Sequence, residues 1–194
     1  MSDSDYSMIF KRKSFHRYLG TGRLEQEELQ EIERRWRHFT PLLEGIQTQM
    51  RIVPRTQTTC KRGEYCILLY SEPAQGYLEN VGYMGEQLDL WLASRDIGTC
   101  WYGMGKTMDA APPGMEFVIM LSIQKEEPQH FRRDVTKARR KPLEELWVGQ
   151  PWPKVASVVR YAPQRLQYAA LASSVPGKRT AGTADLGKAR YDAR

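Results

Sequence analysis

Basic side chains surround a hydroxyl near the start of the chain, in 12–18 (RKSFHRY). Cations and a hydroxyl at this spacing can hold a phosphate through charge-assisted hydrogen bonds. A short basic stretch is also typical of a solvated surface, so the residues by themselves leave both interpretations open. Because an imidazole is mostly uncharged near neutral pH, a site that uses the histidine would bind anions more weakly or in a pH-dependent way. The candidate phosphate ligands are Arg12, Lys13, Ser14 and His16.

The segment 97–103 (IGTCWYG) combines glycines with aromatic side chains. It directly follows 81–95, in which apolar residues recur at helical spacing. Gly98 is expected to cap that helix in a left-handed conformation. Backbone amides and an aromatic group at the edge of a packed core would suit a flat ligand with a polar rim. Cys100 is equally typical of a small core residue. The candidate ligand-facing residues here are Gly98, Thr99, Cys100 and Trp101.

Helices and strands in irregular alternation must position these groups. Apolar spacing predicts helices over 24–39 and 81–95. Apolar and β-branched runs predict strands over 51–53, 65–70 and 116–123, and the second of these is expected to be buried on both faces. Short helices are expected to begin at Pro142 and Pro153. Few connections look like right-handed crossovers, so the predicted class is α+β.

Length and composition favour one folded domain with a tail. A chain of 194 residues that is 41% hydrophobic can bury a sizeable core. The predicted domain covers 7–163. The tail, 164–194, is expected to be disordered, because 172–194 has neither a helical nor a strand period. The formal net charge of +6 invites a nucleic-acid function. The sequence has no common nucleic-acid motif, so a basic surface with a few phosphate-binding cations is the preferred interpretation.

Several other classes are not expected. No apolar run approaches the roughly 20 residues that span a bilayer, and the N-terminus lacks the basic start and apolar stretch of a secretory signal. The cysteines, Cys60, Cys66 and Cys100, are odd in number and widely spaced, which suits a reducing cytoplasm without a disulfide framework. The chain has no Cys-x-x-Cys pair and its histidines are far apart, so no metal site is expected.

These motifs together resemble the FMN-dependent nitroreductases. Segment 12–18 is similar to their Arg-Arg-Ser-Ile-Arg-x-Phe/Tyr signature, with Arg12, Lys13 and Ser14 in matching positions and His16 where Arg or Lys is usual. Segment 97–103 resembles the Gly-(Leu/Ile)-Gly-Thr-x-Trp-x-Gly loop that runs beside the isoalloxazine ring. A subgroup with Gly-Tyr-x-Gly-Glu before that loop, as in 82–86 here, is the nearest match. The resemblance covers roughly 7–163.

The resemblance implies a nitroreductase-like α+β fold, with a central antiparallel sheet flanked by helices. It implies FMN as cofactor, NADH or NADPH as reductant and a nitroaromatic, quinone or similar small acceptor, used in a ping-pong cycle. Segment 139–146 (RRKPLEEL) resembles the closing segment of the family, where a cation reaches the FMN phosphate. Arg140 is the better match for that cation and Arg139 the second. The flavin carries the chemistry, so no catalytic side chain is expected.

The resemblance also predicts an altered C-terminus. The last segment of the nearest subgroup contains Arg-x-Ala-Pro-Ser-x-x-Asn-x-Gln-Pro-Trp; residues 160–163 begin it and 164–172 do not continue it. Codons that encode 163–172 can nevertheless be chosen so that removal of one C yields Pro-Ser-Ala-Phe-Asn-Thr-Gln-Pro-Trp-Arg. We hypothesise that the chain is frameshifted after Pro163, which would leave the fold incomplete. An ordinary diverged C-terminus is the alternative.

Two other functions stay open at this point. The chain could be a relic of such an enzyme, binding flavin weakly without turnover, since an altered C-terminus would remove flavin contacts. It could also be a basic protein that binds nucleic acid or an acidic partner through 132–141. The assembly expected from the family is a homodimer, or a monomer in which one chain supplies both halves of the site. Neither a nucleic acid nor a membrane is an expected partner of the flavoenzyme.

Overall fold

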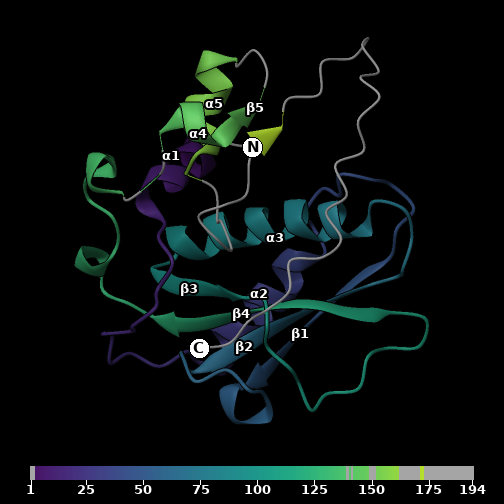
Figure 1. Cartoon of the computed structure of the whole chain (residues 1–194). Helices are drawn as coiled ribbons and strands as arrows, with labels where there is room; N and C mark the ends of the chain where they lie inside the picture. Colours follow the sequence, from purple (N-terminus) through teal and green to yellow (C-terminus); the bar gives the residue numbers. More distant parts are fainter. Residues whose placement is uncertain (1–2, 139, 141, 149–151, 162–170, 173–194) are drawn as a thin grey trace, which may run out of the picture.

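The centre of the molecule is a four-stranded sheet in the order β1-β2-β4-β3 (Figure 1). The computed structural model describes residues 3–138, 140, 142–148, 152–161 and 171–172. Each neighbouring pair of strands runs antiparallel, which confirms the predicted antiparallel sheet. The bounds are β1 Thr48–Pro54, β2 Tyr65–Ser71, β3 Ile97–Tyr102 and β4 Glu116–Lys125.

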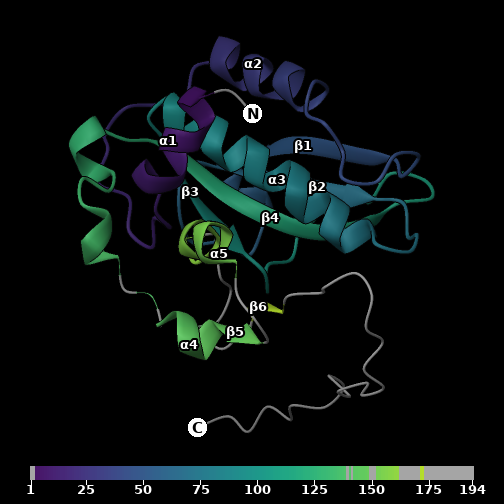
Figure 2. The ribbon, with the colours of Figure 1, turned by 90° about the horizontal axis from the view of Figure 1, so that it is seen from above.

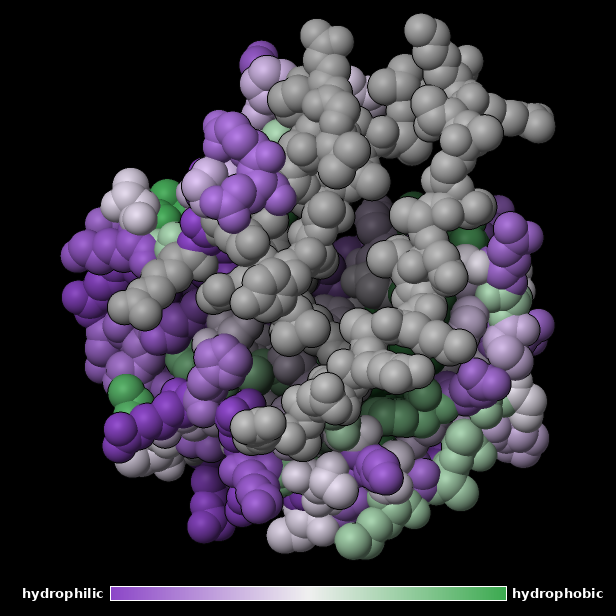
Figure 3. All heavy atoms as spheres, in the orientation of Figure 1, coloured by the Kyte–Doolittle hydropathy of each residue, from purple (hydrophilic) through white to green (hydrophobic). Residues whose placement is uncertain are grey.

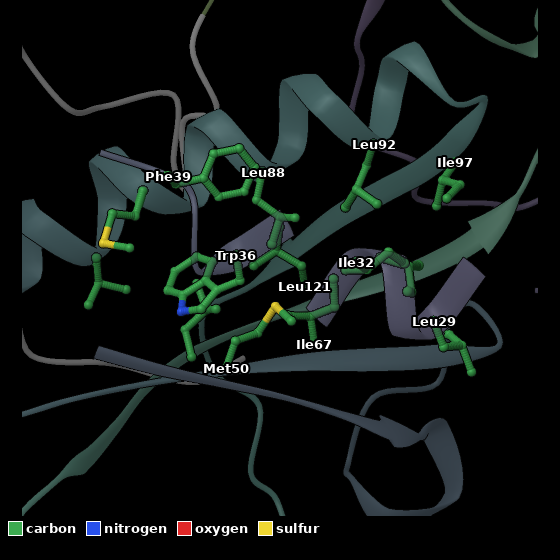
Figure 4. Close-up of a cluster of buried hydrophobic side chains, with 14 of the residues drawn as sticks. Leu29, Ile32, Trp36, Phe39, Met50, Ile67, Leu88, Leu92, Ile97 and Leu121 are labelled. Atoms are coloured by element: carbon green, nitrogen blue, oxygen red, sulfur yellow. The ribbon is translucent and has the colours of Figure 1, made fainter. Parts of the chain in front are cut away.

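Two helices, α2 (Gln26–Trp36) and α3 (Tyr77–Ser94), cover one face of the sheet (Figure 2). The first turn of α2 is fixed by a capping box between Glu25 and Glu28. Apolar side chains of both helices meet those of the central strands in one buried cluster (Figure 4). This cluster includes Leu29, Ile32, Trp36, Ile67, Leu88, Leu92 and Leu121.

The opposite face of the sheet carries a second buried cluster, which includes Cys66, Leu68, Tyr70 and Met120. Because side chains alternate along a strand, β2 contributes to both clusters, and its residues 67–70 are all fully buried. This confirms that β2 is buried on both faces. Cys60 joins the second cluster from the loop between η1 (Arg55–Gln57) and β2.

The end of α3 differs from the prediction. The helix ends at Ser94, and Asp96, with φ 56°, takes the left-handed conformation expected of Gly98. Aspartate tolerates this region because its short polar side chain can form local hydrogen bonds. Gly98 lies instead inside β3, a strand that the sequence did not predict. Position 98 requires a glycine, because a Cβ there would lie 3.0 Å from Phe15 Cγ and 2.9 Å from Glu126 Cγ.

The remaining elements lie around one end of α3. An unpredicted helix, α1 (Asp3–Lys11), lies beside α3 (Figure 2). The predicted short helices are present as α4 (Leu143–Leu146) and α5 (Pro153–Val159). Two short 3₁₀ turns precede them, η2 (Pro128–His130) and η3 (Val135–Lys137). Among the described residues, none of the helices has the length and apolar character needed to cross a membrane.

The predicted disordered tail falls almost entirely outside the described residues. The exception is β6 (Leu171–Ala172), which pairs in parallel with β5 (Trp147–Val148). The division into a domain over 7–163 and a tail over 164–194 therefore stays a prediction.

Candidate functional site

A buried carboxylate in the middle of α3 is the centre of the candidate site. The side chain of Asp89 is fully buried, and its Oδ2 lies 2.9 Å from Nε of Arg12. The indole Nε1 of Trp101 donates to the same oxygen over 2.7 Å. The Thr99 hydroxyl donates to the other carboxylate oxygen. A buried carboxylate needs such partners, so Asp89 fixes the positions of three residues that the sequence singled out.

The chain after α1 lies along the outer edge of β3 and brings the first motif to the second. The backbone N–H of Phe15 donates to the carbonyl of Thr99 over 2.8 Å, and Ser14 forms a parallel bridge with Thr99. Since strand side chains alternate, Thr99 and Trp101 both face α3. Cys100 therefore faces the second cluster, away from Asp89.

A glycine on α3 makes room for the indole. A Cβ at Gly85 would lie 2.6 Å from Cη2 of Trp101, a distance that no real structure tolerates without a shift. A Cβ at Gly82, one turn earlier, would have no atom within 4 Å. Packing therefore requires only the second glycine of the Gly-Tyr-x-Gly-Glu segment.

The guanidinium of Arg12 is buried but only partly paired. Arg12 is 1% exposed, and its Nη2 donates weakly to Oγ of Ser14 over 3.4 Å. Its Nη1 is buried and has no hydrogen-bond partner among the described residues. An unsatisfied buried N–H costs free energy, about 1–3 kcal/mol or more for a charged group. An anion placed at Nη1 would remove that cost.

The charge of Arg12 acts on two further arginines. Burial and the charges of Arg140 and Arg12 lower the pKa of Arg132 to about 10. Burial and the charges of Arg12 and Arg160 likewise lower the pKa of Arg140. A cation whose pKa is lowered by neighbouring cations is held near them against repulsion. We call Arg12, Arg132, Arg140 and Arg160 the arginine cluster; a multivalent anion would stabilise it.

Several elements position the arginine cluster. The guanidinium of Arg140 donates to the carbonyl of Tyr161 over 3.4 Å, while its Nε is buried without a partner among the described residues. The backbone N–H of Arg132 donates to the carbonyl of Lys11 over 2.9 Å. The guanidinium of Arg132 lies 5.9 Å from the ring centre of Tyr161. The cluster thus joins the end of α1, the segment after β4 and the end of α5.

A basic hollow of about 400 Å³ lies beside the arginine cluster. Four of its seven lining residues are cationic and one is acidic. Figure 3 shows hydrophilic side chains gathered along the side of the molecule that carries η2 and η3. The lining residues are Lys13, Phe131, Arg132, Arg133, Asp134, Lys137 and Ala138.

The acidic neighbours do not neutralise the arginine cluster. The single negative charge of Asp89 is shared among Arg12, Thr99 and Trp101. Burial and the negative charge of Asp89 raise the pKa of Glu86, against the opposing effect of Arg12. Glu86 therefore favours its neutral form, because two carboxylates in a buried site cannot both ionise easily.

The other predicted residues lie apart from this centre. Nζ of Lys13 lies over the ring of Phe15, 4.7 Å from its centre. His16 is exposed, and its Nδ1 lies 3.9 Å from Sγ of Cys100. Arg139 lies outside the described residues.

Sequence reasoning missed Asp89, Arg132 and Arg160. The signal for Asp89 was present, since an acid beside Leu88 on a helix face that packs into the core demands a cationic partner. No comparable signal marked Arg132, because the basic residues of 124–141 look alike in sequence.

One comparison with known proteins places this chain in a family, and another supports the fold. The family model described as "Putative TM nitroreductase" matches residues 6–163. No curated protein matches the chain. Solved structures at low identity share the fold, and identities of this size bear on the fold alone.

A "putative nitroreductase" from Thermotoga maritima has a TM-score of 0.55 and 17% identity, covering 84% of this chain and 67% of its own. A "putative nitroreductase in complex with FMN" from Desulfovibrio desulfuricans has a TM-score of 0.54 and 14% identity, covering 79% of this chain and 100% of its own. An "FMN-dependent nitroreductase" from Clostridium difficile has a TM-score of 0.51 and 16% identity, covering 62% of this chain and 86% of its own. Because the family model spans most of the chain and the fold agrees with it, the protein belongs to the nitroreductase family that this model describes.

Proposed function

We propose that the protein is an FMN-dependent oxidoreductase that passes a hydride from NADH or NADPH to a nitroaromatic, quinone or similar small acceptor by a ping-pong cycle. The observation that carries the proposal is the arginine cluster, in which Nη1 of Arg12 and Nε of Arg140 are buried without partners among the described residues. Membership of a nitroreductase family supplies the reaction class.

The chain's residues fit the phosphate of FMN. A phosphate monoester carries nearly two negative charges and accepts several hydrogen bonds. Arg12, Ser14 and Arg140 would donate to it, and Lys13, which lines the basic hollow, would add a charge. Arg132 belongs to the same arginine cluster and is a further candidate ligand of the phosphate. The phosphate would thus relieve the mutual repulsion that the depressed pKa values of Arg132 and Arg140 record.

Each protein group in this proposal binds or orients. When bound, FMN supplies a two-electron acceptor and donor, which the protein itself lacks. Asp89 holds the Arg12 guanidinium in place and keeps Trp101 against α3. The backbone of Gly98, Thr99, Cys100 and Trp101 would border the ring at the edge of the sheet, where β3 lies beside Ser14. No side chain is assigned a proton transfer.

The setting proposed for this enzyme is the cytoplasm, with the protein as a homodimer or as a single chain that supplies both halves of its site. Three free, buried cysteines are consistent with a reducing compartment. The partner is a small-molecule acceptor rather than a nucleic acid or a membrane.

The test is a visible spectrum and an FMN titration of the purified full chain. We expect a flavin band that NADPH or NADH bleaches in the absence of oxygen. We expect Arg140→Ala to weaken FMN binding roughly 10- to 100-fold, as for loss of a charge-assisted hydrogen bond. The matched control, Arg37→Ala, changes an exposed arginine at the end of α2 and should leave FMN binding unchanged.

Three outcomes would contradict the proposal in different ways. A flavin band that neither reductant bleaches would indicate a flavin-binding relic. A colourless protein that binds nucleic acid with strong salt dependence would favour the basic binding protein. Equal FMN affinities of the two arginine variants would exclude the arginine cluster as the phosphate site.

A further inference from the structure

The three cysteines, distant in sequence, gather on the face of the sheet opposite α3. Cys66 on β2 and Cys100 on β3 both pair in register with Ser122 on β4, so the two thiols lie on either side of that residue on one face. Cys60 belongs to the same buried cluster as Cys66. All three are free thiols, and none is more than 4% exposed.

Cys60 and Cys66 are neighbours within this group, and hydrogen bonding between their thiols shifts the pKa of each. The Cys60 thiol also donates to the carbonyl oxygen of Arg62 over 3.5 Å. The Thr58 hydroxyl holds both residues, because it accepts from the backbone N–H of Cys60 over 3.1 Å and lies 3.5 Å from the Cys66 sulfur. Two cysteines in one buried cluster that share the Thr58 hydroxyl need only a local displacement to bring their sulfurs to bonding distance. Cys60 lies in irregular backbone between η1 and β2, so it can approach Cys66 without disturbing the sheet.

The surroundings give the two thiols different roles. The hydrogen bond from Cys66 lowers the pKa of Cys60, and the Arg62 charge adds to this effect against the cost of burial. The same hydrogen bond and burial raise the pKa of Cys66. Burial also raises the pKa of Cys100. Since a thiolate is the reactive form of cysteine, Cys60 is the nucleophile of the group and Cys66 keeps its proton.

We propose that Cys60 and Cys66 are a peroxide-reactive dithiol that converts reversibly to a disulfide. The Cys60 sulfur attacks one oxygen of hydrogen peroxide; an S–O bond forms, the O–O bond breaks, and the leaving hydroxide takes up a proton to become water. The Cys66 sulfur then attacks the Cys60 sulfur, forming the S–S bond and breaking the S–O bond. The second water carries off the Cys66 proton. The two sulfurs together lose two electrons, and the peroxide gains them.

This chemistry is independent of the proposed flavin reaction. The oxidant is hydrogen peroxide, and a small thiol such as dithiothreitol returns the pair to its reduced form by exchange. A disulfide of this kind is transient in a reducing compartment, which agrees with the absence of a disulfide framework expected from the cysteine spacing.

The experiment uses the reduced full chain, treated with stoichiometric hydrogen peroxide under native conditions, then alkylated and digested with trypsin. The sequence places each cysteine on its own tryptic peptide: Cys60 on 56–61, Cys66 on 63–95 and Cys100 on 96–106. We expect a cross-link between the first two peptides that dithiothreitol removes. We expect Cys60 to react with iodoacetamide at least about tenfold faster than Cys100 at pH 7, because more of it is thiolate.

Variants separate the roles of the three thiols. Cys66→Ser should leave a sulfenic acid on Cys60 that dimedone traps, and Cys60→Ser should abolish both products. Cys100→Ser is the matched control and should form the cross-link at the wild-type rate. A cross-link between Cys60 and Cys100, no cross-link at all, or one that forms as fast in urea as in the native protein would overturn the proposal. Peptide mapping of the oxidised wild-type chain tests the proposal even if a variant fails to fold.

Discussion

At the scale of single residues, one carboxylate organises the site. Asp89 forms an ion pair with a guanidinium, accepts hydrogen bonds from an indole and a hydroxyl, and is fully buried. An asparagine cannot serve all three partners, because it is uncharged and its amide nitrogen is itself a donor. We therefore expect Asp89→Asn to lower the free energy of unfolding by about 3–5 kcal/mol, the usual cost of removing one partner of a buried ion pair. Urea unfolding followed by circular dichroism measures this change.

The control for this variant is another ion pair of similar length. Asp109 pairs with Arg51 over 2.7 Å, but both side chains are about a third exposed, at 27% and 34%. Because solvent screens exposed pairs, Asp109→Asn should cost no more than about 1 kcal/mol. If the two variants lose equal stability, burial is not what makes Asp89 important.

The sequence motifs also indicated which single residues lie near one another. Arg12, Ser14, Thr99 and Trp101 were singled out separately, and the structure brings them together. Their partner Asp89 was missed because a motif search looks for cations and aromatics, whereas a buried acid is recognised only once its surroundings are known. Whether these residues bind a cofactor stays a prediction.

At the scale of elements, the connection from α3 to β3 shows what local patterns miss. Gly98 after an amphipathic helix is typical of a cap, but the turn is made by Asp96 and the glycine serves a tertiary contact with Phe15. Strand β3 contains glycine and threonine in place of a long apolar run, so its pairing with β4 was invisible in the sequence. The elements β2 and α3 were predictable, because β2 is a continuous apolar run and α3 has apolar residues at helical spacing. Their arrangement as an antiparallel sheet flanked by helices was implied by the family resemblance.

The two glycines of α3 provide a test of how the helix packs on β3. Gly85→Ala should destabilise the protein by about 1–3 kcal/mol, because the added methyl group meets Trp101 at 2.6 Å and overpacks the contact. Gly82→Ala adds the same group where nothing lies within 4 Å, so helix propensity alone should stabilise the protein by up to about 1 kcal/mol. Thermal unfolding should give shifts of opposite sign. Shifts of the same sign would mean that the indole does not pack on Gly85.

At the scale of the whole molecule, the family match ends just after α5. The family model reaches residue 163, and the last described residues before that point, 152–161, form α5 and its end. Arg160 and Tyr161, which begin the family's last motif in this sequence, already belong to the surroundings of Arg140. A continuation of that motif would therefore start next to the proposed phosphate site.

Restoring the reading frame tests whether that continuation completes the site. Deleting one C from the codon for Pro163, in a gene written with the codons given by the frameshift hypothesis, encodes Ser-Ala-Phe-Asn-Thr-Gln-Pro-Trp-Arg after the proline. Its Asn and Gln would donate and accept hydrogen bonds with the flavin, each contributing about 0.5–1.5 kcal/mol, so we expect FMN to bind roughly tenfold tighter or better. Flavin fluorescence titration of both chains measures the change, and deletion of the whole Pro163 codon, which keeps the present frame, is the control. The hypothesis is wrong if the natural gene has bases over 163–172 that cannot yield this motif after a single deletion. It is also wrong if the restored chain folds but binds FMN no better than the present one.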